Sequence, residues 1–173
     1  MAISDSLAQT PGYETGFKAT DGIIRTWKRS EELPSDAVNA IIQTRDGFLW
    51  VGTSAGLARF DGVSFTKVPL FGPGTNDSIT ALCEDSAGQL WVGSQANGLF
   101  QLAKGSITHF TRSSGLLDEN ITCLAAGGDG LVWIGTRSGL NVAAGADLKS
   151  FTVRDGLPDD WVTGLHVARS GSV

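Results

Sequence analysis

Short runs of alternating apolar and polar residues, interrupted by Gly, Asp and Asn, follow one another along most of this chain. A period of two residues in runs of this length predicts β-strands rather than helices. The runs recur: GFLWVG begins at Gly47, GQLWVG at Gly88 and GLVWIG at Gly130, and the tryptophans in them stand 41 and then 42 residues apart. A period near 40 residues indicates several copies of one small unit, so the repeat determines the predicted fold.

Each copy contains four predicted strands. The first is apolar and alternating, the second is centred on the Trp, the third opens with a Gly-Leu step, and the fourth holds a Phe. The predicted first strands are residues 38–44, 79–85, 121–127 and 162–169. Four-stranded units of about 40 residues are typical of β-propeller blades. We therefore predict an all-β fold, an incomplete β-propeller of four-stranded antiparallel blades whose first strands line the central channel.

The same spacing predicts the boundaries of the parts. Residues 1–21 are an N-terminal extension, and residues 22–173 are a partial propeller with about three full blades. The predicted parts of that propeller are an outer strand at 23–29, blades at 37–69, 78–111 and 120–153, and the start of a next blade at 162–173. These elements do not close a ring by themselves. This predicts a piece of a longer repeat protein or, as the less favoured alternative, two chains that associate through their blade edges as a homodimer.

Two rows of equivalent residues have predicted structural roles. The Trp row is expected to fill the wedge between neighbouring blades, since a Trp buries about 150–250 Å². The Gly row stands two residues further on and is expected to leave space for a neighbour's side chain. The two rows are Trp50, Trp91 and Trp133, and Gly52, Gly93 and Gly135.

Composition and charge exclude several classes of partner. The 173 residues are 41% hydrophobic, which suits a globular protein, and 18 acidic against 13 basic residues give a net charge of −5. No cluster of Lys and Arg occurs, so nucleic acid is not expected as a partner. No apolar run approaches the roughly 18 residues of a membrane helix, and the N-terminus lacks the basic start and apolar core of a signal peptide.

The residues from Leu33 to Gly62 carry a recognisable string: Leu-Pro, Val-x-Ala-Ile, and Asp-Gly-x-Leu-Trp-Val-Gly-Thr-x-x-Gly-Leu-x-Arg-Phe-Asp-Gly. This string resembles the two-component regulator propeller repeat, and the resemblance extends in step over residues 22–173. WD repeats differ, because they have Asp after the Trp, and kelch repeats have a Gly-Gly pair that is missing here. Blade 2 departs from the family pattern at Ala87, where the other copies have Asp46 and Asp129.

The resemblance implies the periplasmic, ligand-sensing part of a bacterial hybrid histidine kinase or a related regulator. Its ligand class, by the same resemblance, is an oligosaccharide or another small extracytoplasmic molecule. The kinase or other output domain of such regulators is not found in these residues. Two alternatives stay open: a stand-alone propeller that acts as a protein-interaction scaffold, and part of a propeller lyase or hydrolase.

The residues that carry chemistry do not combine into a catalytic motif. His109 is expected on the surface of an outer strand, whereas His166 falls on an inner strand. Cys83 and Cys123 occupy different phases of their strands, so their side chains are expected on opposite sheet faces, without a disulfide. We therefore expect no catalysis, no cofactor and no metal site in this segment.

One edge of the blades is the predicted place for a ligand. The loops between blades share this edge with the loops between second and third strands, and half of the chain's acidic residues fall there. They indicate either ordinary turn chemistry or a face that suits neutral glycans, cations or basic peptides. Two features interrupt the repeat: the longer loop at 69–78 with an exposed-looking Phe71, and Trp161, which replaces smaller residues and could stack on a sugar or pack on a next blade. The candidate ligand-binding residues are Phe71, Asp118, Asp160 and Trp161.

Overall fold

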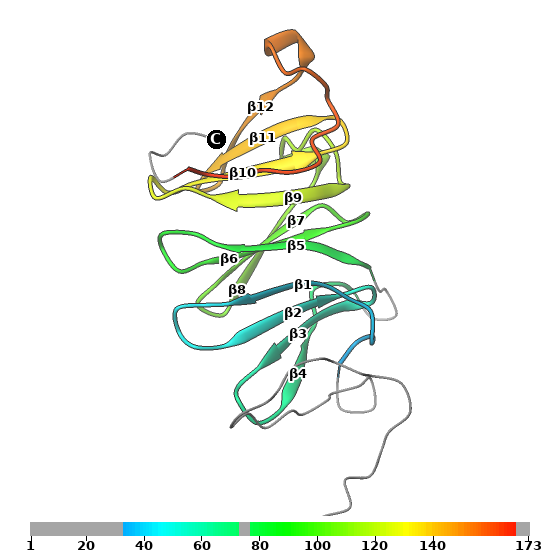
Figure 1. Ribbon diagram of the computed structural model, residues 1–173, viewed down its shortest axis with the longest axis vertical. Coiled ribbons are helices and arrows are strands. Elements are labelled where there is room, and N and C mark those ends of the chain that lie inside the picture. The colour runs from blue at the N-terminus through cyan, green and yellow to red at the C-terminus, as the bar shows by residue number, and fades with distance from the viewer. Residues whose placement is uncertain (1–32, 73–76, 169–173) are drawn as a thin grey trace, which may run out of the picture.

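Three four-stranded antiparallel sheets make up the structure (Figure 1). It is a computed structural model, and it describes residues 33–72 and 77–168. Blade 1 contains β1 (Val38–Gln43), β2 (Leu49–Thr53), β3 (Gly56–Phe60) and β4 (Phe65–Val68). Blade 2 contains β5 (Ile79–Glu84), β6 (Leu90–Ser94), β7 (Leu99–Ala103) and β8 (Ser106–Phe110). Blade 3 contains β9 (Ile121–Ala126), β10 (Leu131–Thr136), β11 (Gly139–Ala144) and β12 (Asp147–Phe151).

In every sheet the strands lie in chain order, so each blade is a simple meander. The predicted all-β fold with four-stranded antiparallel blades is confirmed. Two single turns of 3-10 helix, Arg112–Ser114 and Val153–Asp155, lie in the connections after blades 2 and 3. The predicted extension at 1–21 and the predicted outer strand at 23–29 lie outside the described residues.

The first strand that we expected after blade 3, at residues 162–169, is not formed in the described residues. Residues 162–168 are not a strand, because a strand requires a hydrogen-bonded neighbour along its length and no described segment pairs with these residues. Val162 nevertheless occupies the place of the first residue of an inner strand. Its Cγ1 lies 2.9 Å from the place that a Cβ on Gly135 would take, as Ile79 lies against Gly52 and Ile121 against Gly93.

The inner strands β1, β5 and β9 run side by side across the blades (Figure 1). The second residue of each donates a side-chain hydrogen bond to the carbonyl of the first residue in the next copy. Asn39 Nδ2 donates to the Ile79 oxygen at 3.0 Å, and Thr80 Oγ1 donates to the Ile121 oxygen at 2.6 Å. Thr122 Oγ1 donates in the same way to the Val162 oxygen. This repeated contact holds the inner strands together where no backbone ladder joins them.

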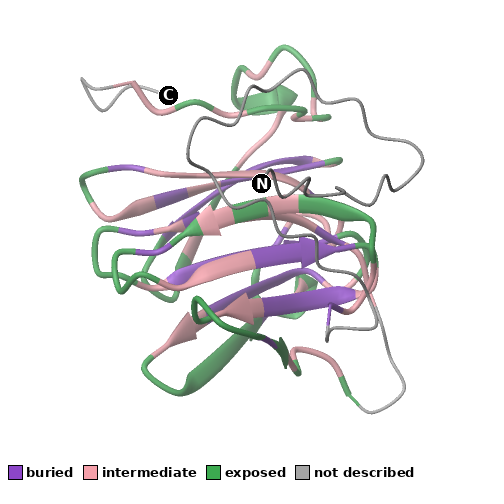
Figure 2. Ribbon diagram, turned by 60° about the horizontal axis from the view of Figure 1, so that its bottom comes forward, coloured by how far each residue is buried: buried purple, intermediate pink, exposed green. Residues whose placement is uncertain are grey.

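Most of the apolar core lies between blades rather than within one blade. The buried residues concentrate in the second and third strands of the blades, and the buried segments lie in the middle of the molecule (Figure 2). We call the contact between blades 1 and 2 seam 1–2, and that between blades 2 and 3 seam 2–3. The buried residues of seam 1–2 are Leu57, Ile79, Leu90, Val92 and Phe100, with Trp50 packed against them. Those of seam 2–3 are Cys83, Trp91, Leu99, Phe110, Leu116, Ile121, Val132, Ile134 and Ala143.

The glycine row permits the close approach of these blades. A Cβ on Gly52 would lie 2.5 Å from Cγ2 of Ile79, and a Cβ on Gly93 would lie 2.5 Å from Cγ2 of Ile121. Any side chain there would force the sheets apart. The third Trp of the repeat, Trp133, lies on the equivalent face of blade 3, away from blade 2, where it lines an open pocket together with Val142 and Phe151.

Candidate functional site

The loops between second and third strands lie at the same edge as the segments that lead into each inner strand. Backbone hydrogen bonds join them: Ser54 N–H donates to the Ala37 oxygen at 2.9 Å, and Val162 N–H donates to the Thr136 oxygen at 3.0 Å. We call this edge the loop face. The opposite edge carries the tight turns between first and second and between third and fourth strands, and we call it the hairpin face.

The carboxylates of the loop face act mainly as acceptors for turn backbone. Asp118 Oδ1 accepts from Asn120 N–H at 2.9 Å, and Asp159 Oδ1 accepts from Trp161 N–H at 2.8 Å. Ser35 accepts from Ala37 N–H in the equivalent turn before blade 1. These contacts support the interpretation of the acidic residues as turn chemistry, since Asp and Ser stabilise such turns by hydrogen bonding two residues on.

Asp77 has the densest set of contacts on this face. Its Oδ2 accepts from the backbone N–H groups of Ala96 and Asn97 and from the Asn97 side chain, at 2.9–3.0 Å, while Oδ1 accepts from Ser78 N–H. Burial by itself would raise the pKa of this carboxyl. The hydrogen bonds, led by that of the Asn97 side chain, outweigh burial and place the pKa below its ordinary value.

Asp118, a predicted site residue, joins the segment before blade 3 to the β10–β11 turn. Its Oδ2 accepts from Ser138 Oγ at 2.7 Å and pairs with Arg112 Nη2 at 3.1 Å. Burial raises the pKa of Asp118, but the hydrogen bonds from Asn120 and Ser138 and the nearby Arg112 together lower it below the usual range. Asp118 is thus held in its charged form by the protein's own groups.

Trp161 and Asp160, also predicted site residues, follow blade 3. The Trp161 side chain is 57% exposed, the largest exposed aromatic surface among the described residues. The Arg137 guanidinium, from the β10–β11 turn, lies 5.7 Å from the centre of its ring. Asp160 Oδ1 accepts from Val153 N–H at 2.8 Å and so stabilises the connection that carries Trp161. The structure therefore brings Asp118, Asp160 and Trp161 to one part of the loop face.

Phe71 is less exposed than we expected from the sequence. Its ring is half-buried and meets Phe100 edge-on, with centroids 5.4 Å apart, so it packs against seam 1–2 instead of standing free. It is separated from Trp161 by the whole of blades 2 and 3 in chain order. The longer loop at 69–78 that carries it includes residues 73–76, which lie outside the described residues.

Sequence reasoning missed Arg137. The string Thr-Arg-Ser-Gly-Leu has a basic residue where the first copy reads Thr-Ser-Ala-Gly-Leu. The shared edge placed this turn and Trp161 on the same face, but the repeat did not indicate that the Arg137 side chain lies against the Trp161 ring, 24 residues further on.

The remaining candidates do not form a centre for chemistry. His109 is exposed, as expected, and stacks on Phe100 with centroids 4.2 Å apart. Cys83 faces seam 2–3, whereas Cys123 lies against Gly135 on the other side of blade 3, and both thiols are free. Among residues 33–72 and 77–168, no group of three His, Cys, Asp or Glu side chains could hold a metal, and no helix is long and apolar enough to cross a membrane.

Comparison with known proteins supports the repeat. A family model described as a two component regulator propeller matches residues 32–55, 73–96 and 115–138, one segment in each copy. No curated protein matches the chain.

Solved structures with the same fold include an extracellular domain of a protein described as a one component system from B. thetaiotaomicron. It is 26% identical with a TM-score of 0.71, over 83% of this chain and 20% of that one. An extracellular domain of a hybrid two component system from the same organism is 23% identical with a TM-score of 0.70, over 79% of this chain and 20% of that one.

A virginiamycin B lyase from Staphylococcus aureus shares the fold alone, at 16% identity and a TM-score of 0.57, over 69% of this chain and 43% of that one. The chain spans only about a fifth of the two extracellular domains.

Proposed function

The chain carries three repeats of the two component regulator propeller family, and we propose that it belongs to an extracytoplasmic sensor and contributes to ligand binding without catalysis. The proposal has two supports. The repeats match in each of the three blades, and a 26% identical structure is described as an extracellular domain. Since the chain spans a fifth of that structure, the output that such a sensor controls is not part of the proposal.

The observation that carries the binding role is the pair formed by Trp161 and Arg137 on the loop face. A large exposed indole next to a guanidinium offers a flat apolar surface beside several hydrogen-bond donors. Asp118 and Asp160 lie in the segments that position this pair, and their hydrogen bonds to backbone groups hold those segments in place. Such a surface suits a small neutral sugar, which presents an apolar ring face and several hydroxyl groups.

The proposal is tested by isothermal titration of the protein with a panel of neutral oligosaccharides. We expect at least one to bind, and Trp161→Ala to weaken that binding by roughly tenfold because the apolar stacking surface is lost. Trp161→Phe, which keeps an aromatic face, should retain most of the affinity. Val63→Ala on the β3–β4 turn of the hairpin face is the matched control, because it also truncates an exposed apolar side chain.

If no oligosaccharide binds, or if Trp161→Ala and Val63→Ala have equal effects, the proposed binding role is wrong. The location is tested separately, by fractionation of cells that express the gene from its own locus. Recovery of the protein in the cytoplasmic fraction would contradict the extracytoplasmic assignment and favour the scaffold alternative.

A further inference from the structure

A cleft lies on the hairpin face, at seam 1–2. Its volume is about 340 Å³, within the range of small-molecule sites. Leu90 and Leu102 of blade 2 and the indole of Trp50 form its apolar floor. The walls are the β1–β2 turn and Arg59 from blade 1, and the β7–β8 turn with Lys104 from blade 2. Both blades are therefore needed to form it.

Arg59 is the first unusual feature of this cleft. Its guanidinium carbon lies 4.4 Å from the centre of the Phe48 ring and 5.9 Å from that of Trp50, so two aromatic side chains hold it in place. Among the described residues, no carboxylate lies within ion-pair distance of it. The equivalent residue in blade 2 is Gln101, which donates to Gln89 Oε1 at 2.9 Å and closes the same position.

Lys104 is the second unusual feature of this cleft. With φ of 37°, it is the one residue other than Gly that has a positive φ in the described part of the chain. A left-handed backbone costs a lysine roughly 1–2 kcal/mol, and Asn, Asp or Gly would be the ordinary choice at this place in a two-residue hairpin turn. Outliers of this kind concentrate at functional sites. Here the turn brings a second cation to the cleft opposite Arg59.

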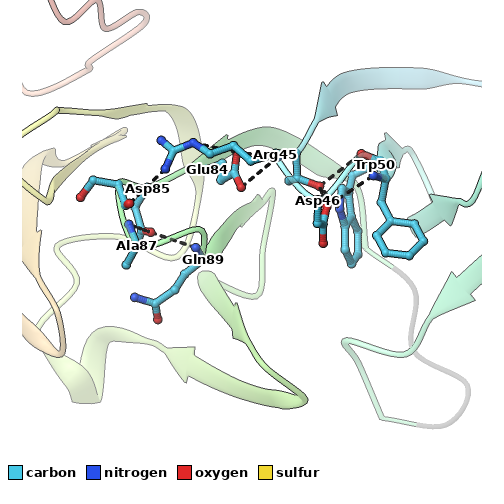
Figure 3. A network of polar contacts seen from close by, with 10 residues as sticks. Arg45, Asp46, Trp50, Glu84, Asp85, Ala87 and Gln89 are labelled. Carbon is cyan, nitrogen blue, oxygen red and sulfur yellow. Dashed lines mark hydrogen bonds and ion pairs between the residues drawn. The ribbon is translucent and has the colours of Figure 1, made fainter.

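The carboxylates of Glu84 and Asp46, near the cleft, accept hydrogen bonds from groups in the neighbouring turns. Glu84 accepts from the Arg45 backbone N–H with both oxygens, at 3.1 and 3.2 Å, and Arg45 in turn donates to the Ser86 carbonyl (Figure 3). Asp46 Oδ1 accepts from Thr44 Oγ1 and from Phe48 N–H. These contacts stabilise the turns around the cleft. Asp46 also lines it and Asp61 attracts Arg59 over a longer distance, but among the described residues no carboxylate forms an ion pair with Arg59 or Lys104.

We propose that this cleft binds a small organic anion. Its anionic group, a carboxylate or a phosphate, would lie between Arg59 and Lys104, and its apolar part would cover Leu90, Leu102 and the edge of Trp50. Arg59 supplies the planar fork of donors that matches such groups, already fixed by Phe48 and Trp50. The site is on the edge opposite Trp161, so it is independent of the proposed sugar site, and either proposal can fail without the other.

The test uses pairs of ligands that differ in the anionic group. Galacturonate is titrated against galactose, and glucose 6-phosphate against glucose, with inorganic sulfate as the free ion; Trp50 in the floor of the cleft permits a fluorescence readout alongside calorimetry. We expect one of the two organic anions to bind at least tenfold more tightly than its neutral partner. The pair that does so identifies the carboxylate or the phosphate as the preferred group.

Variants separate the cleft from overall charge. Arg59→Gln copies the residue of blade 2 and should fold, and it should lower the affinity for the preferred anion at least tenfold. Lys104→Gly suits the turn better than Lys does and should lower the affinity severalfold without loss of thermal stability. Lys67→Gln removes one positive charge from the exposed strand β4 and should leave the affinity within twofold.

Three results would overturn the proposal. One is that neither organic anion binds more tightly than its neutral partner. Another is that Arg59→Gln and Lys67→Gln weaken binding equally, which would show that only net charge matters. The third is that sulfate binds as tightly as the preferred organic anion, because the apolar floor would then contribute nothing.

Discussion

Seam 1–2 and seam 2–3 are built from the same repeat but differ in how tightly they close. In seam 2–3, Trp91 is 1% exposed, stacks on Phe110 with centroids 5.7 Å apart, and donates to Asp85 Oδ2 at 2.8 Å. In seam 1–2, Trp50 stays half-buried and donates to Thr44 Oγ1 at 3.1 Å, and a cleft opens beside it.

A few side chains account for that difference. Gln89 and Gln101 bond to each other beside Trp91, whereas Phe48 and Arg59 take their places beside Trp50. An amide pair satisfies itself within the blade, but a guanidinium on an aromatic ring keeps its donors available. Both seams therefore contain the same Trp wedge between blades. The residues beside the Trp, which differ between the copies, decide whether the seam is closed or leaves a cleft that can hold a ligand.

The largest expected effect comes from removing the two tryptophans. Trp91→Ala should lower the free energy of unfolding by about 4 kcal/mol, since it empties a fully buried site and removes the donor that pairs with Asp85. Trp50→Ala should cost about 2 kcal/mol, because less of its surface is buried. Urea denaturation of both variants measures the difference. Equal losses would show that the two seams are equally tight.

Adding a methyl group at a position of the glycine row should destabilise a seam by overpacking it, whereas the Trp variants leave a cavity. Gly93→Ala places a Cβ 2.5 Å from Ile121 Cγ2, and the overpacking should cost about 2 kcal/mol. Gly128→Ala is the matched control, since a Cβ there meets nothing within 4 Å. Thermal denaturation should show a lower Tm for Gly93→Ala alone. An unchanged Tm would mean that the blades can shift apart without cost.

Thiol labelling compares the opening of the seams directly. Burial, with a smaller contribution from Asp85, raises the pKa of Cys83 to about 12, so its thiol should resist alkylation at pH 8 while seam 2–3 is closed. The equivalent residue in seam 1–2 is Ile42. In a background with Cys83→Ala and Cys123→Ser, Ile42→Cys should react roughly tenfold faster than Cys83 does in the Cys123→Ser protein. Equal rates would contradict the difference between the seams.

Acid titration tests the loop-face ends of blades 2 and 3 and has the smallest expected effect. The folded pKa of Asp77 and of Asp118 is depressed, so each stabilises the fold above its unfolded pKa of about 3.9, and that stabilisation is lost as the pH falls through the folded value. Asp77→Asn and Asp118→Asn should each flatten the decline of Tm below pH 4. The flattening should be larger for Asp77, which accepts more hydrogen bonds. Adding 0.5 M salt should weaken only the contribution of Asp118, through its ion pair with the exposed Arg112 side chain.

Much of the fold was predictable because it depends on local pattern. Alternation, Gly-containing turns and a period near 40 residues are properties of the chain itself, and they predicted the strands of all three blades and the edge at which Asp118 and Trp161 meet. The pairing of Phe71 with Phe100 was not predictable, since the long loop gave no indication of the direction in which the ring turns.

The sequence by itself determined the repeat: which residues form strands, which face of each strand is apolar, and where glycine is needed. Only the tertiary structure decided what lies across a seam. Lys104 lies opposite Arg59 and Arg137 lies beside Trp161, and each of these pairs joins two different copies of the repeat. Their positions depend on the distance between blades, and that distance is set by packing at Gly52 and Gly93 rather than by any local preference of the chain.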